Sequence, residues 1–106
     1  MKRQNQLDGG DCYEAAVQLL LRLGEGALLV HGEVVGQGRI DGIRYGHAWV
    51  ELNGSVLDPS NGMLRAFIAE EYFAIGKIDR TKLLRYSLHE AMEWMRKTEH
   101  YGPWER

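Results

Sequence analysis

Residues 45–58 read YGHAWVELNGSVLD and contain the clearest structural signal in the chain. Over residues 47–52, apolar side chains alternate with polar or aromatic ones, which is the period of a strand with two different faces. Asn53-Gly54 follows, and this dipeptide favours a type I′ turn because both residues tolerate a positive φ angle. The sequence therefore predicts a β-hairpin with Asn53-Gly54 at its tip.

The predicted turn fixes which residues lie opposite each other in this hairpin. The expected pairs are Leu52 with Ser55, Glu51 with Val56, Val50 with Leu57, Trp49 with Asp58 and His47 with Ser60. His47 and Asp58 are then diagonal neighbours on one face, with backbones about 7 Å apart, a gap that their side chains can bridge. A shift of one residue in the register would separate them.

A helix is predicted over residues 11–23. Asp11 suits the N-cap position, because its carboxylate can accept hydrogen bonds from the free amides of the first turn. Apolar or small residues recur at helical spacing and form one stripe: Cys12, Ala15, Ala16, Leu19, Leu20 and Leu23. Gly24 ends the helix. Cys12, the only cysteine of the chain, is therefore expected at the edge of the core, in the first turn.

Further strands are predicted on both sides of the hairpin. Residues 27–35 are aliphatic and β-branched and are bounded by glycines, which indicates a strand. The glycine-rich residues 36–46 that follow are either the margin of a cleft or a simple connecting loop. Residues 71–78 favour a strand that pairs with residues 83–86 in a second hairpin, and a short helix ended by Gly76 is the alternative.

The C-terminal part is predicted to be helical. Ser87 and Glu90 form a capping box, which indicates a helix that continues to about Thr98. Trp104 is expected to fold back onto the domain. The whole chain, residues 1–106, is predicted to be one α+β domain. Its N-terminal helix carries the cysteine and packs on a small antiparallel sheet, and a C-terminal helix covers another part.

The composition is that of an ordinary globular protein. Hydrophobic residues make up 44% and charged residues 26% of the chain, which argues against disorder. The formal net charge is −2, so we expect no basic surface for nucleic acid.

Residues 1–6 lack the apolar core of a signal peptide, and the apolar run 19–21 is too short to cross a membrane. One cysteine cannot form an intramolecular disulfide, so a cytoplasmic location is expected.

Three residues have the side chains that thiol catalysis needs. Attack on an amide or ester requires a thiolate, a base that holds its proton and a group that orients the base. The helix N-terminus favours negative charge on Cys12. Asp58 would accept from one ring nitrogen of His47 and leave the other facing the sulfur. The backbone amide of Cys12 and the side chain of Gln6 are the expected donors to an oxyanion.

Residues 6–60 resemble the papain-like and transglutaminase-like cysteine enzymes in the order of these groups. The spacing of Gln6 and Cys12 is similar to that of the oxyanion glutamine and the nucleophile in papain-type peptidases. Residues 46–51, GHAWVE, and 56–58, VLD, are similar to the His and Asp strands of bacterial transglutaminase-like peptidases, including those that cleave leader peptides from lasso precursors. The resemblance implies a cysteine amidohydrolase or acyl-transfer enzyme that acts on a peptide bond or a glutamine side chain.

The chain also departs from that family. Tyr13 stands where papain-type enzymes carry Trp, the interval from His47 to Asp58 is short, and the chain has no room for papain's two-lobed cleft. We expect Tyr13, Gly46 and Trp49 to bind a peptide or protein acyl substrate. Trp49 has a second interpretation, in which it shields the bond between His47 and Asp58 from water.

Each candidate also has a purely structural interpretation. A single cysteine on an apolar stripe is often a core residue, His47 could be a half-exposed surface residue, and Asp58 could only form a turn. The alternative function is a non-catalytic binding protein, from a mobile element, on the same scaffold. His31 is expected to be packed in the sheet. His89 and His100 have no metal-spaced partners, so no metal or cofactor is expected.

Overall fold

The computed structural model describes residues 10–36 and 42–105. Their elements are α1 (Gly10–Leu23), β1 (Leu28–Val35), β2 (Arg44–Leu52), β3 (Ser55–Asp58), the 3₁₀ turn η3 (Ser60–Gly62), β4 (Arg65–Ile68), α2 (Ala69–Ile75), the 3₁₀ turn η4 (Arg80–Lys82), β5 (Leu84–Tyr86) and α3 (Leu88–Thr98). The strands form one antiparallel sheet with the order β4-β3-β2-β1-β5. The predicted α+β class and layout are confirmed.

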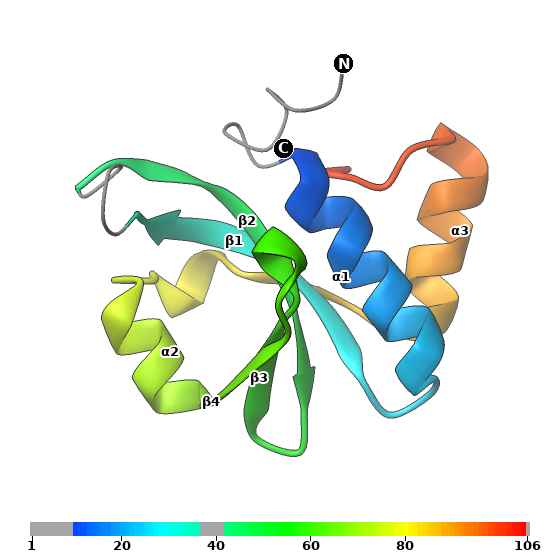
Figure 1. The fold of residues 1–106 in the computed structure, drawn as a ribbon. Helices are drawn as coiled ribbons and strands as arrows, with labels where there is room; N and C mark the ends of the chain where they lie inside the picture. Colours follow the sequence, from blue (N-terminus) through cyan, green and yellow to red (C-terminus); the bar gives the residue numbers. More distant parts are fainter. Residues whose placement is uncertain (1–9, 37–41, 106) are drawn as a thin grey trace.

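The sheet separates two clusters of buried apolar side chains. Figure 1 shows α1 and α3 together on one side of the sheet and α2 on the other. On the α1 side, the sheet contributes Leu29, Ala48 and Val50. On the α2 side, it contributes a different set, Val30, Val34, Trp49 and Val56. This division follows from the alternation of side chains along β1 and β2, because consecutive residues of a strand point to opposite faces.

Helix α1 is the helix predicted over residues 11–23, and its buried side differs slightly from the predicted stripe. Ala16, Val17 and Leu20 have no exposed surface, whereas Leu23 is 39% exposed. Gly24 ends the helix as expected. It adopts a φ angle of +81°, which glycine reaches without a steric cost, and its N–H donates to the carbonyl of Leu20 at 2.9 Å.

The hairpin formed by β2 and β3 has the predicted turn and register. Asn53 and Gly54 both have positive φ angles, 52° and 80°, as a type I′ turn requires. The strand partners are Leu52 with Ser55, Glu51 with Val56 and Val50 with Leu57. His47 and Asp58 therefore lie on the face of the sheet that α2 covers. The predicted strand at residues 27–35 is β1, which pairs with β2 along its whole length.

The prediction of a strand at residues 71–78 is wrong, and the alternative of a short helix is confirmed. Residues 69–75 form α2, which Gly76 ends by donating its N–H to the carbonyl of Tyr72 at 3.0 Å. Glu70 and Glu71 lie in the first turn, where carboxylates interact favourably with the helix dipole. The buried aromatic pair Tyr72 and Phe73 suited a strand equally well by composition, which is why the sequence was ambiguous.

The second predicted hairpin is absent because its first strand is a helix. Residues 84–86 form β5, which pairs with β1 on the edge opposite β4. Strand β4, at residues 65–68, was not predicted and pairs with β3. The capping box is confirmed, with the Ser87 side chain accepting from the Glu90 N–H and the Glu90 side chain accepting from the Ser87 N–H.

The segment after α3 folds back onto the domain, as expected for Trp104. The ring of Trp104 stacks on Trp94 with a centroid distance of 6.0 Å and also contacts Tyr86 at 5.1 Å.

The glycine-rich residues 36–46 were predicted to be either a cleft margin or a connecting loop, and residues 37–41 of this stretch lie outside the described residues. Within the described ranges, none of the helices has the length and apolar character needed to cross a bilayer.

Candidate active site

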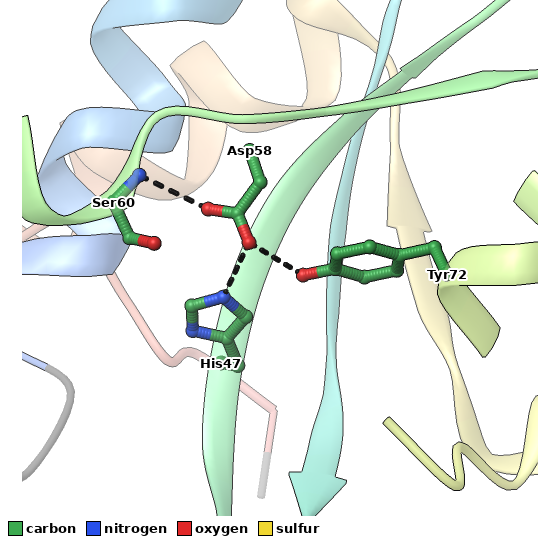
Figure 2. Close-up of polar contacts among 4 residues, drawn as sticks. All are labelled: His47, Asp58, Ser60 and Tyr72. Carbon is green, nitrogen blue, oxygen red and sulfur yellow. Dashed lines mark hydrogen bonds and ion pairs between the residues drawn. The ribbon is translucent and has the colours of Figure 1, made fainter. Parts of the chain in front are cut away.

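A buried bond between His47 and Asp58 forms the centre of the candidate site. Nε2 of His47 lies 3.0 Å from Oδ2 of Asp58. The two residues are only 6% and 7% exposed. Their elements are β2 and β3, and the hairpin register makes them the diagonal neighbours that the sequence predicts. Figure 2 shows the imidazole ring and the carboxylate directed toward each other.

Two further donors hold the carboxylate of Asp58. Its Oδ1 accepts from the backbone N–H of Ser60 at 3.0 Å, and its Oδ2 accepts from the hydroxyl of Tyr72 at 2.7 Å. Ser60 belongs to η3 and Tyr72 to α2, and Figure 2 shows them approaching the carboxylate from opposite directions. A carboxylate with donors on both oxygens has little freedom to rotate, so Asp58 is well suited to orient the ring of His47.

Cys12 interacts with the same imidazole ring from the first turn of α1. It is 6% exposed, and its side chain lies close enough to His47 to help raise the pKa of that ring. The second ring nitrogen of His47, Nδ1, is buried, and no nitrogen or oxygen atom of the described residues is hydrogen-bonded to it. Helix α1 also contacts η3, which directly follows Asp58 in the chain. The structure therefore brings together the three residues predicted for thiol catalysis.

The charges of this cluster stabilise one another. Burial, the largest influence, disfavours the protonated ring of His47, but the interactions with Asp58 and Cys12 outweigh it and raise its pKa to about 9. Burial also opposes ionisation of Asp58, yet His47, followed by Tyr72 and Ser60, holds the pKa of this carboxyl well below its usual range. The pair is therefore favoured as an imidazolium next to a carboxylate near neutral pH.

Two tyrosines near the pair were not predicted as site residues. Tyr45 is partly buried, its ring meets His47 edge-on at a centroid distance of 5.8 Å, and burial raises its pKa, with further increases from Cys12 and Asp58. Tyr45 lies two residues before His47, so the alternation of the strand could have identified it. Tyr72 could not be found in this way, because its contact with Asp58 depends on the helix α2.

Ser60 was expected opposite His47 in the hairpin, but its hydrogen bond in the structure is to Asp58. The side chain of Asp58 accepts from the N–H two residues later, which is a common arrangement for Asp in a turn. The structure thus supports the interpretation of Asp58 as a turn former. The same carboxylate forms the turn with one oxygen and binds His47 with the other.

Trp49, Tyr13 and Gly46, predicted to bind substrate, contact protein groups in the structure. Trp49 has no exposed surface, and its ring lies 6.0 Å from His47 and 5.2 Å from Tyr72, measured between ring centroids. This position favours the shielding role for Trp49. Tyr13 is 4% exposed, and its hydroxyl lies only 2.7 Å from the position that a Cβ would take on Gly46. Gly46 therefore makes room for Tyr13, and contact with substrate stays a prediction.

The remaining candidates are Gln6 and the other histidines. Gln6, the predicted oxyanion donor, lies outside the described residues. His31 is fully buried among aromatic rings, as expected for a packed histidine, whereas His89 and His100 are exposed. In the part of the chain that the structure describes, no three His, Cys, Asp or Glu side chains are grouped as a metal site would need.

No family model, curated protein or solved structure matches this chain. The interpretation of the site therefore depends on the geometry and charges of the residues that form it.

Proposed function

We propose that this protein is a cysteine enzyme that cleaves or transfers acyl groups at amide bonds, related to the papain-like and transglutaminase-like enzymes. Cys12 is the nucleophile, His47 the acid and base, and Asp58 the group that orients His47. The observation that carries this proposal is the buried His47–Asp58 bond together with the interaction of Cys12 with the same ring. Peptide bonds and glutamine side chains are the proposed substrates.

The burial of this pair supports a functional role. Removing an imidazole and a carboxylate from water costs free energy, and buried ion pairs often contribute little net stability compared with apolar residues of similar size. Such pairs with shifted pKa values are concentrated at functional sites. Here the pair lies beside the only cysteine of the chain, which is the side chain that gains most in reactivity from an adjacent imidazolium.

In the first step, the thiolate of Cys12 attacks the carbonyl carbon of the substrate and forms a carbon–sulfur bond. The carbonyl oxygen becomes an oxyanion, for which the backbone amide of Cys12 and the side chain of Gln6 are the proposed donors. His47 then gives its proton to the leaving nitrogen as the carbon–nitrogen bond breaks. The products are a free amine, or ammonia from glutamine, and a thioester on Cys12.

In the second step, the neutral ring of His47 accepts a proton from water or from an acceptor amine as that molecule attacks the thioester. The carbon–sulfur bond breaks, and Cys12 and His47 return to their starting states. Attack by water gives hydrolysis, and attack by an amine gives acyl transfer. This chemistry requires a reduced thiol, so we propose that the protein acts in a reducing compartment such as the cytoplasm.

Acylation by p-nitrophenyl acetate tests the proposal without knowledge of the natural substrate. The released nitrophenolate is measured over time, and the acetylated residue is located by mass spectrometry. We expect rapid acetylation of Cys12 followed by slower turnover, which are the signs of an acyl-enzyme. The Cys12→Ser and His47→Ala variants should lose the rapid phase, while His89→Ala, which removes an exposed histidine in α3, should retain it.

Two results would contradict an enzyme. The first is acetylation of Cys12 no faster than that of a free thiol such as N-acetylcysteine at the same pH. The second is equal acetylation rates in the wild type and in His47→Ala. Either result would favour the alternative, a non-catalytic binding protein on the same scaffold, whose affinity for its partner should survive the Cys12→Ser substitution.

A further inference from the structure

One carboxylate oxygen of Asp58 accepts hydrogen bonds from two different groups. Oδ2 lies 3.0 Å from Nε2 of His47 and 2.7 Å from the hydroxyl of Tyr72, while Oδ1 bonds the Ser60 N–H. Figure 2 shows both donors meeting at this one oxygen. The position of Asp58 would already be fixed by Ser60 and His47, so the bond from Tyr72 has a consequence beyond placement.

The hydroxyl of Tyr72 is held in place by its surroundings. The side chain is only 8% exposed, and its ring packs against Trp49 and Phe67 with centroid distances of 5.2 and 5.1 Å. Helix α2 thus presents a phenol to Asp58 through a rigid aromatic contact. Burial and the neighbouring Asp58 raise the pKa of Tyr72 far above its ordinary value, so this group remains a neutral donor.

A donor on Oδ2 weakens the attraction of that oxygen for a second proton donor. A hydrogen bond from a phenol withdraws part of the negative charge of a carboxylate oxygen, and less charge then remains to stabilise the protonated ring of His47. If Asp58 held the imidazolium too tightly, His47 would release its proton slowly to a leaving amine. It would also rarely be neutral, as the second step requires.

We propose that Tyr72 is a positioning residue that limits, through Asp58, how tightly the site holds the proton on His47. Its part in turnover depends on the proposed function, but its effect on His47 does not. Removing the hydroxyl should strengthen the bond between Asp58 and the imidazolium. A residue that merely anchored Asp58 would act in the opposite sense, because a loosened carboxylate stabilises the imidazolium less.

The other groups that face the pair stay in place when the hydroxyl of Tyr72 is removed. Among the described residues they are Cys12 from α1, Tyr45 from β2 and Arg65 from β4, which lies opposite Asp58 and has an exposed side chain. The Tyr72→Phe substitution keeps the ring that packs on Trp49 and Phe67. A change in the protonation of His47 can therefore be attributed to the bond on Oδ2.

Titration of the histidine ring signals by NMR tests this inference directly. His47 is identified by the signal that disappears in His47→Gln. We expect the midpoint for His47 to move to higher pH in Tyr72→Phe, by about 0.5 to 1, which corresponds to the loss of one buried hydrogen bond. Tyr86→Phe, which removes a hydroxyl from a buried tyrosine on the other face of the sheet, should leave the midpoint unchanged.

If the titration midpoint of His47 moves to lower pH in Tyr72→Phe, Tyr72 only anchors Asp58. If the midpoint does not change, Tyr72 has no influence on the pKa of His47. Either result would overturn the inference. If Tyr72→Phe does not fold, 3-fluorotyrosine can be incorporated at position 72 alone by stop-codon suppression. This analogue is a stronger donor, so the midpoint for His47 should then fall, and a constant or rising midpoint would overturn the inference. Neither titration requires turnover, so the acylation experiment can fail or succeed independently.

Discussion

Two buried histidines lie on neighbouring strands of this protein and have very different surroundings. His31 on β1 pairs with Ala48 on β2, the residue next to His47, so the two imidazole rings belong to opposite faces of the sheet. His31 has no exposed surface and lies among the rings of Tyr13 and Tyr86 and that of Trp104. His47 is almost as buried, but its ring is hydrogen-bonded to the carboxylate of Asp58, which accepts two further hydrogen bonds.

The comparison teaches that burial alone does not give a histidine a chemical role. Loss of solvent disfavours the charged ring at any buried position, and a hydrogen-bonded negative charge can reverse this effect. Asp58 supplies that charge to His47, and Cys12 adds to it. The two positions therefore offer a direct test, since substitutions at His47 and its partners should affect reactivity, and substitutions around His31 should affect packing.

The largest effect is expected from Asp58→Asn. The amide cannot stabilise an imidazolium as a carboxylate does, so the pKa of His47 should fall and the thiol should lose its charged partner. We expect alkylation of Cys12 by iodoacetamide near neutral pH to slow by about 10- to 30-fold, because an ordinary thiol is only a few per cent thiolate at this pH. The rate is measured by quenched mass spectrometry, with His89→Ala as the control. An unchanged rate would show that Asp58 has only a role in the turn.

The stability of the fold should depend on pH through the same pair. His47 has its pKa raised from 6.5 to about 9, so its stabilising effect is complete below about pH 6.5 and is lost as the pH rises toward 9. We expect the free energy of unfolding, from urea titrations, to fall by roughly 1 to 3 kcal/mol across this interval. Asp58 acts in the opposite direction, because its lowered pKa gives stability that is lost in strong acid.

Substitution of His47 separates the contribution of its ionisation to the free energy of unfolding from other effects of pH. In His47→Gln the free energy of unfolding should vary much less between pH 6.5 and 9, while in His31→Phe the wild-type slope should remain. An equal slope in wild type and His47→Gln would mean that the imidazole of His47 does not hold its proton more tightly in the folded state.

Near His31, Gly102→Ala should destabilise the fold without altering the bond between His47 and Asp58. Gly102 has a φ angle of +114°, and an added Cβ would lie 2.8 Å from Cε1 of His31. Both the backbone strain and this close contact are unfavourable, so we expect a loss of about 2 kcal/mol in urea unfolding. The midpoint of the NMR titration of His47 should not move. A variant as stable as the wild type would contradict the close packing at this position.

The smallest effect is expected from His31→Phe. Phenylalanine is aromatic and similar in size, so it should pack among the rings of Tyr13, Tyr86 and Trp104 at a cost of less than about 1.5 kcal/mol. Alkylation of Cys12 should remain within about twofold of the wild type, because His31 lies on the face of the sheet opposite His47 and Asp58 and leaves their bond intact. A large loss of reactivity would show that His31 contributes to the site.

The parts of the fold that could be predicted depend on local sequence. Asn53-Gly54 sets the turn, the turn sets the register, and the register brings His47 next to Asp58. The helix around Cys12 and the capping box at Ser87 are local signals in the same sense. These features are determined by residues within a few positions of each other, which is why a single sequence was sufficient.

The parts that could not be predicted depend on tertiary contacts. The strand predicted at residues 71–78 was based on aromatic and β-branched residues, and packing against the sheet decides in favour of the helix α2 at residues 69–75. The pairing of β5 with β1 joins segments far apart in the chain. The bond from Tyr72 to Asp58 depends on the formation of α2, since it exists only when α2 covers the face that carries the pair.

The reaction of Cys12 with iodoacetamide at about pH 6 tests most directly whether thiol, imidazole and carboxylate act as one unit. At this pH a free thiol is almost entirely protonated and reacts slowly. We predict that Cys12 reacts at least about 10-fold faster than N-acetylcysteine, and that His47→Ala abolishes this advantage whereas His89→Ala preserves it. A wild-type rate at or below that of the free thiol, unchanged in His47→Ala, would show that the three groups do not cooperate.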